Sequence, residues 1–279
     1  MAFSVLNNIA GINAQNQLNI NSVSLNKTLL RLSSGRRINS GADDAAGLGI
    51  ADSLRANVRA LDQAVRNAND GISVAQIGDG ALQEISNLLT RGFSLAEQAA
   101  TDTVDAVGRT ALNAELTSIK SEIDRIATQA NYNGVMLFTA AGLNGSLNIF
   151  VGDTASVSSI AVTFAVITTT SVGGTDISGA SLTTADGAST AITTLKNALA
   201  GIATARADLG AGMNRLQSAV AVLQNMSENT QAAESAIRDA NMAEEIANLT
   251  KYQILAQSGI AALSQANASS QNVLALLRQ

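Results

Sequence analysis

Large aliphatic residues recur at helical spacing at both ends of the chain. Those near the N-terminus are Val5, Ile9, Ile12, Leu18, Leu25, Leu29 and Leu32, of which Leu18, Leu25 and Leu32 are seven residues apart. Those near the C-terminus occupy two heptad positions, Ile246, Ile260 and Leu274 in one and Leu249, Leu263 and Leu277 in the other. This spacing is typical of a narrow coiled-coil seam, and it predicts a long helix at each end.

Charged residues return inside these ends. A Gly- and Ser-rich stretch, Ser33–Gly47, predicts a connector. Apolar positions at helical spacing then predict a helix from about Asp43 to Thr101 and a second from about Asp105 to Ala130. The sequence Asn-Tyr-Asn-Gly at 131–134 ends the second helix with residues that favour turns.

The hydrophobic period then changes from helical to alternating. Leu147, Ile149 and Val151 lie at alternate positions, and so do Ile160, Val162, Phe164 and Val166, which predicts two short strands. The Gly-, Ser- and Thr-rich stretch Ser171–Thr190 predicts a surface loop, and helical periodicity resumes from about Thr190 to Asp239.

Together these elements predict a mainly α fold, an elongated antiparallel helical bundle or coiled coil with a small β-hairpin module at its tip. We expect three parts. Residues 1–40 and 241–279 form a terminal-helix core domain, and residues 41–140 and 188–240 form a helical rod domain. Residues 141–187 hold the hairpin and a variable surface loop, so that any outer domain is minimal or absent.

Neither terminal helix has enough apolar surface to fold alone. Ordering about thirty residues costs more conformational entropy than the burial of about ten large aliphatic side chains returns. An isolated terminal helix is therefore marginal in water. We expect each end to become ordered only when it packs on the opposite end and on neighbouring copies of the chain.

Composition removes most enzyme and metal sites. The chain of 279 residues has no Pro, Cys, His or Trp, so it lacks disulfides, the commonest general base and the usual zinc ligands. No Gly precedes a lysine, which excludes a P-loop, and the acidic pair Asp43–Asp44 is what the helix dipole favours in a first turn. We expect no enzyme activity, no cofactor and no metal site.

Charge and hydropathy bear on partners and location. The net charge of −5 argues against nucleic acid as a partner. The first basic residue is Lys27, and no continuous apolar run precedes it, so we expect no cleaved signal peptide. The longest strongly apolar run, Ile160 to Ile167, is too short for membrane insertion.

Three separated stretches resemble one family. They are Leu25 to Ile85 (LNKTLLRLSSGRRINSGADDAAGLGI and onward), Glu122 to Phe138 (EIDRIATQANYNGVMLF) and the C-terminal AAESAIRDANMAEEIANLTKYQILAQSGIAALSQANASSQNVLALLRQ. In this order they resemble bacterial flagellins. The resemblance implies a D0–D1-like architecture with the terminal helices innermost, and a homopolymeric filament outside the cell. It also implies unfolded type III export with a chaperone at the C-terminal end, and cap and hook-junction proteins as further partners.

The resemblance also touches an innate immune receptor of animal hosts. Receptor-binding flagellins carry a helix consensus like LQRVRELAVQ, and the matching stretch is LTRGFSLAEQ at 89–98. Arg91 and Gln98 match, and Glu115 aligns with an acidic contact on the next helix. Gly92, Phe93, Ser94 and Glu97 depart from the consensus, so receptor recognition is not predicted from this partial match.

The leading interpretation is a structural subunit that polymerises through its terminal helices into the flagellar filament used for motility. Two alternatives stay open from the residues. A hook–filament junction protein would have similar ends but would be a trace component of filaments. A secreted coiled-coil adhesin or effector would bind a host or surface partner and would never form filaments.

Overall fold

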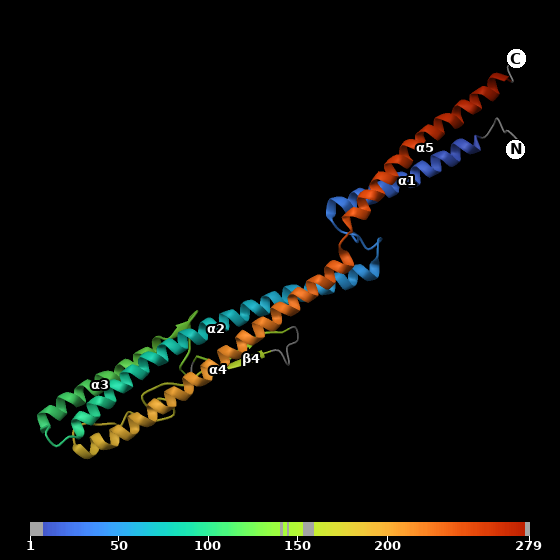
Figure 1. Cartoon of the computed structure of the whole chain (residues 1–279). Helices are drawn as coiled ribbons and strands as arrows, with labels where there is room; N and C mark the ends of the chain where they lie inside the picture. Colours follow the sequence, from blue (N-terminus) through green and yellow to red (C-terminus); the bar gives the residue numbers. More distant parts are fainter. Residues whose placement is uncertain (1–7, 140–141, 144, 153–158, 277–279) are drawn as a thin grey trace. The chain divides into compact units, whose positions relative to one another are not determined.

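The computed structural model describes residues 8–139, 142–143, 145–152 and 159–276 of the chain. Within them it is mainly helical, as predicted (Figure 1). The helices are α1 (Ile9–Ser34), α2 (Ala45–Ala100), α3 (Ala106–Gln129), α4 (Ala185–Arg238) and α5 (Met242–Leu276). Each predicted helix is thus present, with ends that differ from the expected ones by a few residues.

Side-chain caps and one glycine fix the helix ends. Asp44 Oδ1 accepts a hydrogen bond from Gly47 N at 2.8 Å at the start of α2, and Asp105 Oδ1 accepts from Gly108 N at 2.7 Å at the start of α3. Gly35, with φ of 70°, ends α1 in the left-handed conformation that glycine adopts without strain. Helix α4 begins before the predicted Thr190, because Thr184 Oγ1 caps it by accepting from Gly187 N at 3.1 Å.

The strands form two antiparallel hairpins. In the predicted one, β3 (Ser146–Phe150) pairs with β4 (Ser159–Thr163), with Leu147 opposite Val162. The other, β1 (Asn131–Tyr132) with β2 (Val135–Met136), was not predicted. Its turn residues, Asn133 and Gly134, both have positive φ (50° and 81°), which is the type I′ geometry that an Asn-Gly pair favours.

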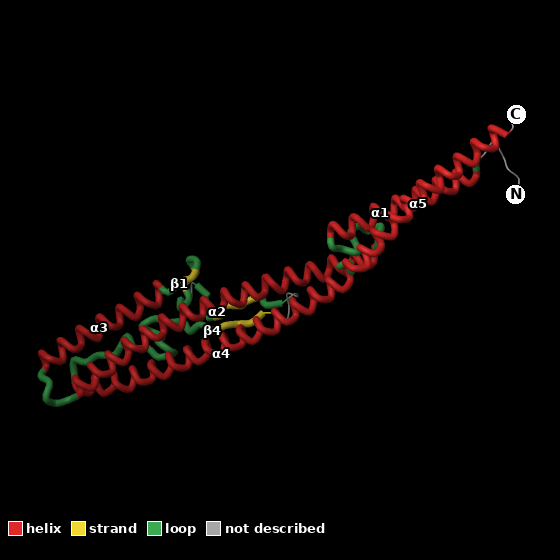
Figure 2. Tube along the Cα trace, turned by 45° about the horizontal axis from the view of Figure 1, so that its top comes forward, coloured by secondary structure: helices red, strands yellow, loops and turns green. Residues whose placement is uncertain are grey.

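The chain divides into two compact units, one of which is continuous, Asn57–Glu228. In this central unit α3 and the β3–β4 hairpin pack on the included parts of α2 and α4 (Figure 2). Phe138 and Phe164 meet edge to face, with ring centroids 6.1 Å apart. Glycines at 71 and 78 on α2 leave room for Ile149 and Phe164, so the hairpin lies along the helices and not at the tip where we expected it.

The Gly-, Ser- and Thr-rich stretch before α4 is not the surface loop that we predicted. Val172, Ile177 and Leu182 are fully buried in the core of the central unit. They are spaced among small polar residues without a clear period, which is why composition alone suggested a loop on the surface. The stretch is therefore part of the core of the central unit.

Polar side chains of α3 hold the same stretch in place. Lys120 Nζ donates to the carbonyl oxygens of Ser178 and Ala180, at 3.0 and 2.6 Å. Asn113 Oδ1 accepts from Leu182 N at 2.9 Å, and Asp124 Oδ1 accepts from Thr169 N at 2.8 Å. Burial lowers the pKa of Lys120, and the charge of Asp176 partly offsets this effect. These bonds satisfy backbone groups that would otherwise be buried unpaired.

The second unit joins the two ends of the chain, Met1–Ala56 and Asn229–Gln279. Within it the connector after α1 pairs with the connector before α5. Arg37 N donates to Arg238 O at 2.7 Å, and Ala240 N donates to Gly35 O at 3.0 Å. This short antiparallel contact places the ends of α1 and α5 that are nearest to the connectors next to each other.

Candidate functional site: the paired terminal helices

Helices α1 and α5 lie side by side and antiparallel (Figures 1 and 2). At one end Asn8 Nδ2 donates to Asn267 Oδ1, and at the other Arg31 Nη1 donates to Glu245 Oε1, both at 3.3 Å. Between them Leu18 lies over Gly259, where an added Cβ would be 3.2 Å from Leu18 Cδ1. Residues far apart in the sequence thus form one continuous pair of helices.

The contact between the two helices is a heptad seam of small and aliphatic residues. On α1 the buried or half-buried positions that keep this spacing are Gly11, Ala14, Leu18, Asn21, Leu25, Thr28 and Leu32. On α5 they are Glu245, Leu249, Tyr252, Ala256, Gly259, Leu263 and Ala266. Small residues allow close approach of the two backbones. Of the predicted seam residues, this contact brings together Leu18, Leu25, Leu32, Leu249 and Leu263.

Other predicted seam residues lie outside this contact and are exposed. They are Ile9, Ile12, Leu29, Ile246 and Ile260, with exposed fractions between 43 and 63 %. Val5 and Leu277 lie outside the described residues, and for Leu274 only the helical backbone is described. The predicted set therefore divides into residues that pack within the chain and residues that the chain itself leaves open.

A second apolar stripe on α1 was missed from the sequence. Ile20, Val23 and Leu30 are 57, 69 and 56 % exposed, and at 100° per residue they share a face with Ile9 and Ile12 opposite the seam. The signal was present in the sequence, since Ile9, Val23 and Leu30 also fall in one heptad frame. On α5, Ile254 faces away from the seam in the same way, 57 % exposed.

Charge in these helices is confined to the end beside the connectors. Residues 1–26 and 252–277 contain no Asp, Glu, Lys or Arg. Beside the connectors, Lys27 Nζ is 2.7 Å from Asp43 Oδ1. The hydrogen bond from Lys27 lowers the pKa of Asp43 to about 2, and the backbone N–H groups of Asn39 and Ser40 contribute to this shift while burial opposes it. Ion pairs thus stabilise the end of the pair beside the connectors, and the rest of the pair is uncharged.

A buried arginine lies at the end of α4. Arg238 Nη1 is 3.6 Å from both Asp52 Oδ1 and Glu234 Oε1, and the side chain is 9 % exposed. Its Nε and Nη1 have no hydrogen-bond partner within the described residues. The two carboxylates offset its charge at a distance longer than a hydrogen bond, so the group stabilises the connector only modestly.

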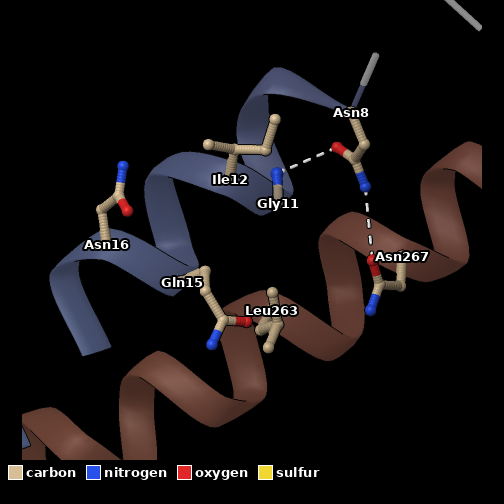
Figure 3. A pocket seen from close by; sticks show the side chains of 7 residues that line it. All are labelled: Asn8, Gly11, Ile12, Gln15, Asn16, Leu263 and Asn267. Carbon is tan, nitrogen blue, oxygen red and sulfur yellow. Dashed lines mark hydrogen bonds between the residues drawn. The ribbon is translucent and has the colours of Figure 1, made fainter. Parts of the chain in front are cut away.

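An open pocket of about 310 Å³ lies where α1 begins (Figure 3). Its lining is uncharged and comes from both helices: Asn8, Gly11, Ile12, Gln15, Asn16, Leu263 and Asn267. Amide groups and two aliphatic side chains suit an uncharged protein surface. They offer neither a nucleophile nor an ionisable group for chemistry on a substrate.

The residues that match the receptor-binding consensus lie in the central unit and not in α1 or α5. Arg91 Nη2 and Glu115 Oε1 form an ion pair at 2.8 Å on the surface. Gln98 is exposed on α2, beyond Arg91 along the helix. The structure brings Arg91 and Glu115 together, and each neutralises part of the charge that the other would present to a partner.

The described residues offer neither a metal site nor a membrane-spanning helix. They contain no group of three or more acidic side chains arranged to hold a metal ion. No described helix is both long enough and apolar enough to traverse a lipid bilayer. The feature that distinguishes this molecule is thus the exposed apolar surface of α1 and α5.

Comparison with known proteins identifies this architecture. The model of the bacterial flagellin N-terminal helical region matches residues 5–142, and that of the C-terminal helical region matches residues 192–277. Flagellin FlaB1 of Treponema pallidum is 38 % identical over 97 % of this chain and 98 % of its own length. The chain belongs to the bacterial flagellin family. The flagellin of Halalkalibacterium halodurans is also 38 % identical, with the same coverage.

This flagellin is therefore a structural subunit that polymerises into the extracellular bacterial filament used for motility, and the two alternatives are not favoured. Among solved structures, a putative flagellar hook-associated protein from Vibrio parahaemolyticus matches with a TM-score of 0.59 over 71 % of this chain and all of its own. At 14 % identity this likeness concerns the fold alone. The relatives that match over nearly the whole chain are named as flagellins and filament core proteins.

Proposed function

We propose that the paired helices α1 and α5 are the surface through which this flagellin enters the filament. In this proposal the predicted seam residues have two roles. Leu18, Leu25, Leu32, Leu249 and Leu263 join the two helices within one subunit. Neighbouring subunits pack against the other predicted seam residues, which are Val5, Ile9, Ile12, Leu29, Ile246, Ile260, Leu274 and Leu277. They also pack against the exposed residues that the prediction missed, Ile20, Val23, Leu30 and Ile254.

The observation that carries the proposal is the apolar stripe of α1 opposite the seam. Val23 is 69 % exposed and Ile20 57 %, and both belong to the charge-free part of the helix. A helix with apolar residues on both faces is normally buried on both. Because the described residues cover only one face of α1, the other face requires a partner, and in a homopolymer that partner is a second copy.

The charge-free surface supports the same partner. Identical subunits packed around one axis bring like side chains close to each other, and like charges there would repel in a water-poor interior. Residues 1–26 and 252–277 avoid this cost because they carry uncharged side chains only, most of them amide, hydroxyl or aliphatic. We infer that this part of the pair is ordered on assembly and is marginal in the free subunit.

The domain division follows from this proposal. Residues 1–40 and 241–279 would form the inner, D0-like domain. Residues 41–140 and 188–240 would form the D1-like helical rod, and residues 141–187 would carry the hairpin with little or no outer domain. The chain would have no catalytic activity, since its role is served by packing surfaces.

Further partners follow from the family. We expect an export chaperone to hold the C-terminal end, and cap and hook-junction proteins to meet the same terminal surfaces. We do not expect immune-receptor recognition, because Arg91 and Glu115 pair with each other, and Gly92 and Phe93 depart from the receptor-binding consensus.

Substitution of Val23 by Asp tests the proposal. The change adds a charge to a site that is exposed in the single chain, so the free subunit should keep its circular dichroism spectrum and its unfolding midpoint. Assembly induced by salting-out and seeding should be lost, because the charge would be buried unpaired between copies. Val23→Thr, which keeps the shape and adds no charge, is the control and should assemble. Normal filaments from Val23→Asp, seen by electron microscopy, would exclude this face as a subunit contact.

A further inference from the structure

Asn8 makes contacts to two helices with one side chain. Its Oδ1 accepts a hydrogen bond from Gly11 N at 2.9 Å and so caps the start of α1. Its Nδ2 donates to α5, to the carbonyl oxygen of Ala266 and to Asn267 Oδ1, both at 3.3 Å. Figure 3 shows the amide between the first turn of α1 and the facing turn of α5.

The orientation of this amide is determined by its surroundings. The atom facing Gly11 N must be an acceptor, because a backbone N–H only donates. The NH2 group therefore faces α5, where both partners are oxygen atoms that accept. One planar group in one orientation satisfies both helices, so that forming either contact aligns the amide for the other.

The residue at position 11 leaves room for this amide. A Cβ added to Gly11 would lie 2.8 Å from Asn8 Nδ2 and 3.0 Å from Asn8 Cγ. A larger residue would displace the amide from the position where it reaches α5. Glycine otherwise weakens a helix near its start, so its presence here fits a requirement for close packing.

We propose that Asn8 is a positioning residue that makes the first turn of α1 depend on the presence of α5 and sets where the two helices meet. This inference rests on the proposed function, since its consequence is felt in assembly. Ser and Asp cap helices about as well as Asn does. Among the residues favoured at this position, only Asn also carries an amide donor that can reach across to a neighbouring helix.

The contact of Asn8 with α5 lies at the end of the helix pair that is remote from the connectors. The bonds between the connectors fix the pair beside Gly35 and Ala240, at the far end of α1 from Asn8. Between these ends the seam repeats every seven residues with small side chains, which leaves its open end weakly specified. Asn8 fixes that end and thereby holds Ile12 and Leu263 in the walls of the open pocket.

The test measures the critical concentration for assembly in Asn8→Ser, Asn267→Ala and the double variant. In Asn8→Ser the serine still caps α1 but is too short to reach α5. The critical concentration should therefore rise about three- to tenfold, which corresponds to the loss of one or two hydrogen bonds. Asn267→Ala should have a smaller effect, because the carbonyl of Ala266 remains. In the Asn8→Ser background, Asn267→Ala should not raise the critical concentration further, because the hydrogen bond between the two side chains is already lost. Asn69→Ser, the same substitution at an exposed position of α2 in the central unit, is the matched control and should change the critical concentration less than twofold.

Amide hydrogen exchange of the assembled filaments supplies the second measurement. Asn8→Ser should increase exchange in the first two turns of α1 and leave the central unit unchanged. An unchanged critical concentration, or additive effects of the two substitutions, would overturn the role of Asn8. If the parent filament showed no protection in α1 and α5 at all, the proposed assembly surface itself would fail, which is a different and separable result.

Discussion

The central unit and the terminal pair use the same aliphatic residues in opposite ways. In the central unit, the side chains of Leu82, Ile85, Leu89 and Phe138 are fully buried among α2, α3, α4 and the hairpin. In α1 the described buried residues are Gly11 and Thr28, and in α5 the buried residue is Glu245. The central unit encloses a large core within the chain, although single residues such as Val107 and Val222 are exposed. The described residues of α1 and α5 include no buried large aliphatic side chain.

This difference separates the two requirements of a subunit that polymerises. A central unit with its own core can be stable before assembly, since that core is buried within one chain. A terminal pair with an open apolar face gains stability only from additional copies, and that gain drives assembly. The same hydrophobic effect thus folds one region and joins the other to its neighbours.

Two truncations to alanine should differ most in their effect on the free energy of unfolding, and they test the difference between the two regions. Leu116→Ala removes a side chain that is 1 % exposed and packed against Gly92, so unfolding of the free chain should become easier by about 2–5 kcal/mol. Val23→Ala removes a side chain that is 69 % exposed, so it should change that free energy by less than about 0.5 kcal/mol. Denaturant unfolding of the unassembled protein measures both.

The filament should reverse this order. Val23→Ala should raise the critical concentration for assembly, because a neighbouring copy loses its contact with the valine. Leu116→Ala should leave the critical concentration nearly unchanged at temperatures where the central unit stays folded. Equal effects of the two substitutions in both measurements would remove the distinction between a closed and an open region.

The sequence predicted the elements whose periodicity is strong. The heptads of Leu18, Leu25 and Leu32, and of Leu249 and Leu263, predicted both terminal helices, and these five residues are half-buried there. The alternation around Leu147 and Val162 gave the β3–β4 hairpin. These features depend on apolar residues that repeat at fixed intervals, so the periodicity of the sequence is sufficient to predict them.

The features that were missed depend on tertiary contacts. The stretch with Val172, Ile177 and Leu182 resembles a loop in composition, and only its packing in the core of the central unit shows otherwise. The β1–β2 hairpin was missed because its strands are only two residues long. Which aliphatic residues of α1 face α5 and which stay open also requires the register of the pair, set by contacts such as Arg31 with Glu245.

The ion pair between Arg31 and Glu245 should have a medium effect on the stability of the terminal pair. Glu245 is 7 % exposed, and its removal in Glu245→Ala leaves the largely buried guanidinium of Arg31 without its carboxylate. The terminal pair should lose about 1–3 kcal/mol, since an uncompensated charge is costly where water is scarce. Thermal depolymerisation of filaments should then occur at lower temperature. The double variant Arg31→Met with Glu245→Leu, which removes both charges, should recover most of the loss, and failure to recover would assign the effect to packing.

The smallest effect concerns acid and the ion pair at the connector. The pKa of Asp43, lowered from 3.8 to about 2, means that the folded state holds the carboxylate more favourably than the unfolded state does. Its contribution is complete above about pH 4 and is lost as the pH falls from there through about 2. Since Lys27 is 46 % exposed and screened by solvent, we expect about 1 kcal/mol. Asp43→Asn should flatten this part of the pH dependence of unfolding in the unit that contains α1 and α5. A variant with the same slope as the parent between pH 4 and 2 would show that other carboxylates dominate acid loss of the terminal pair.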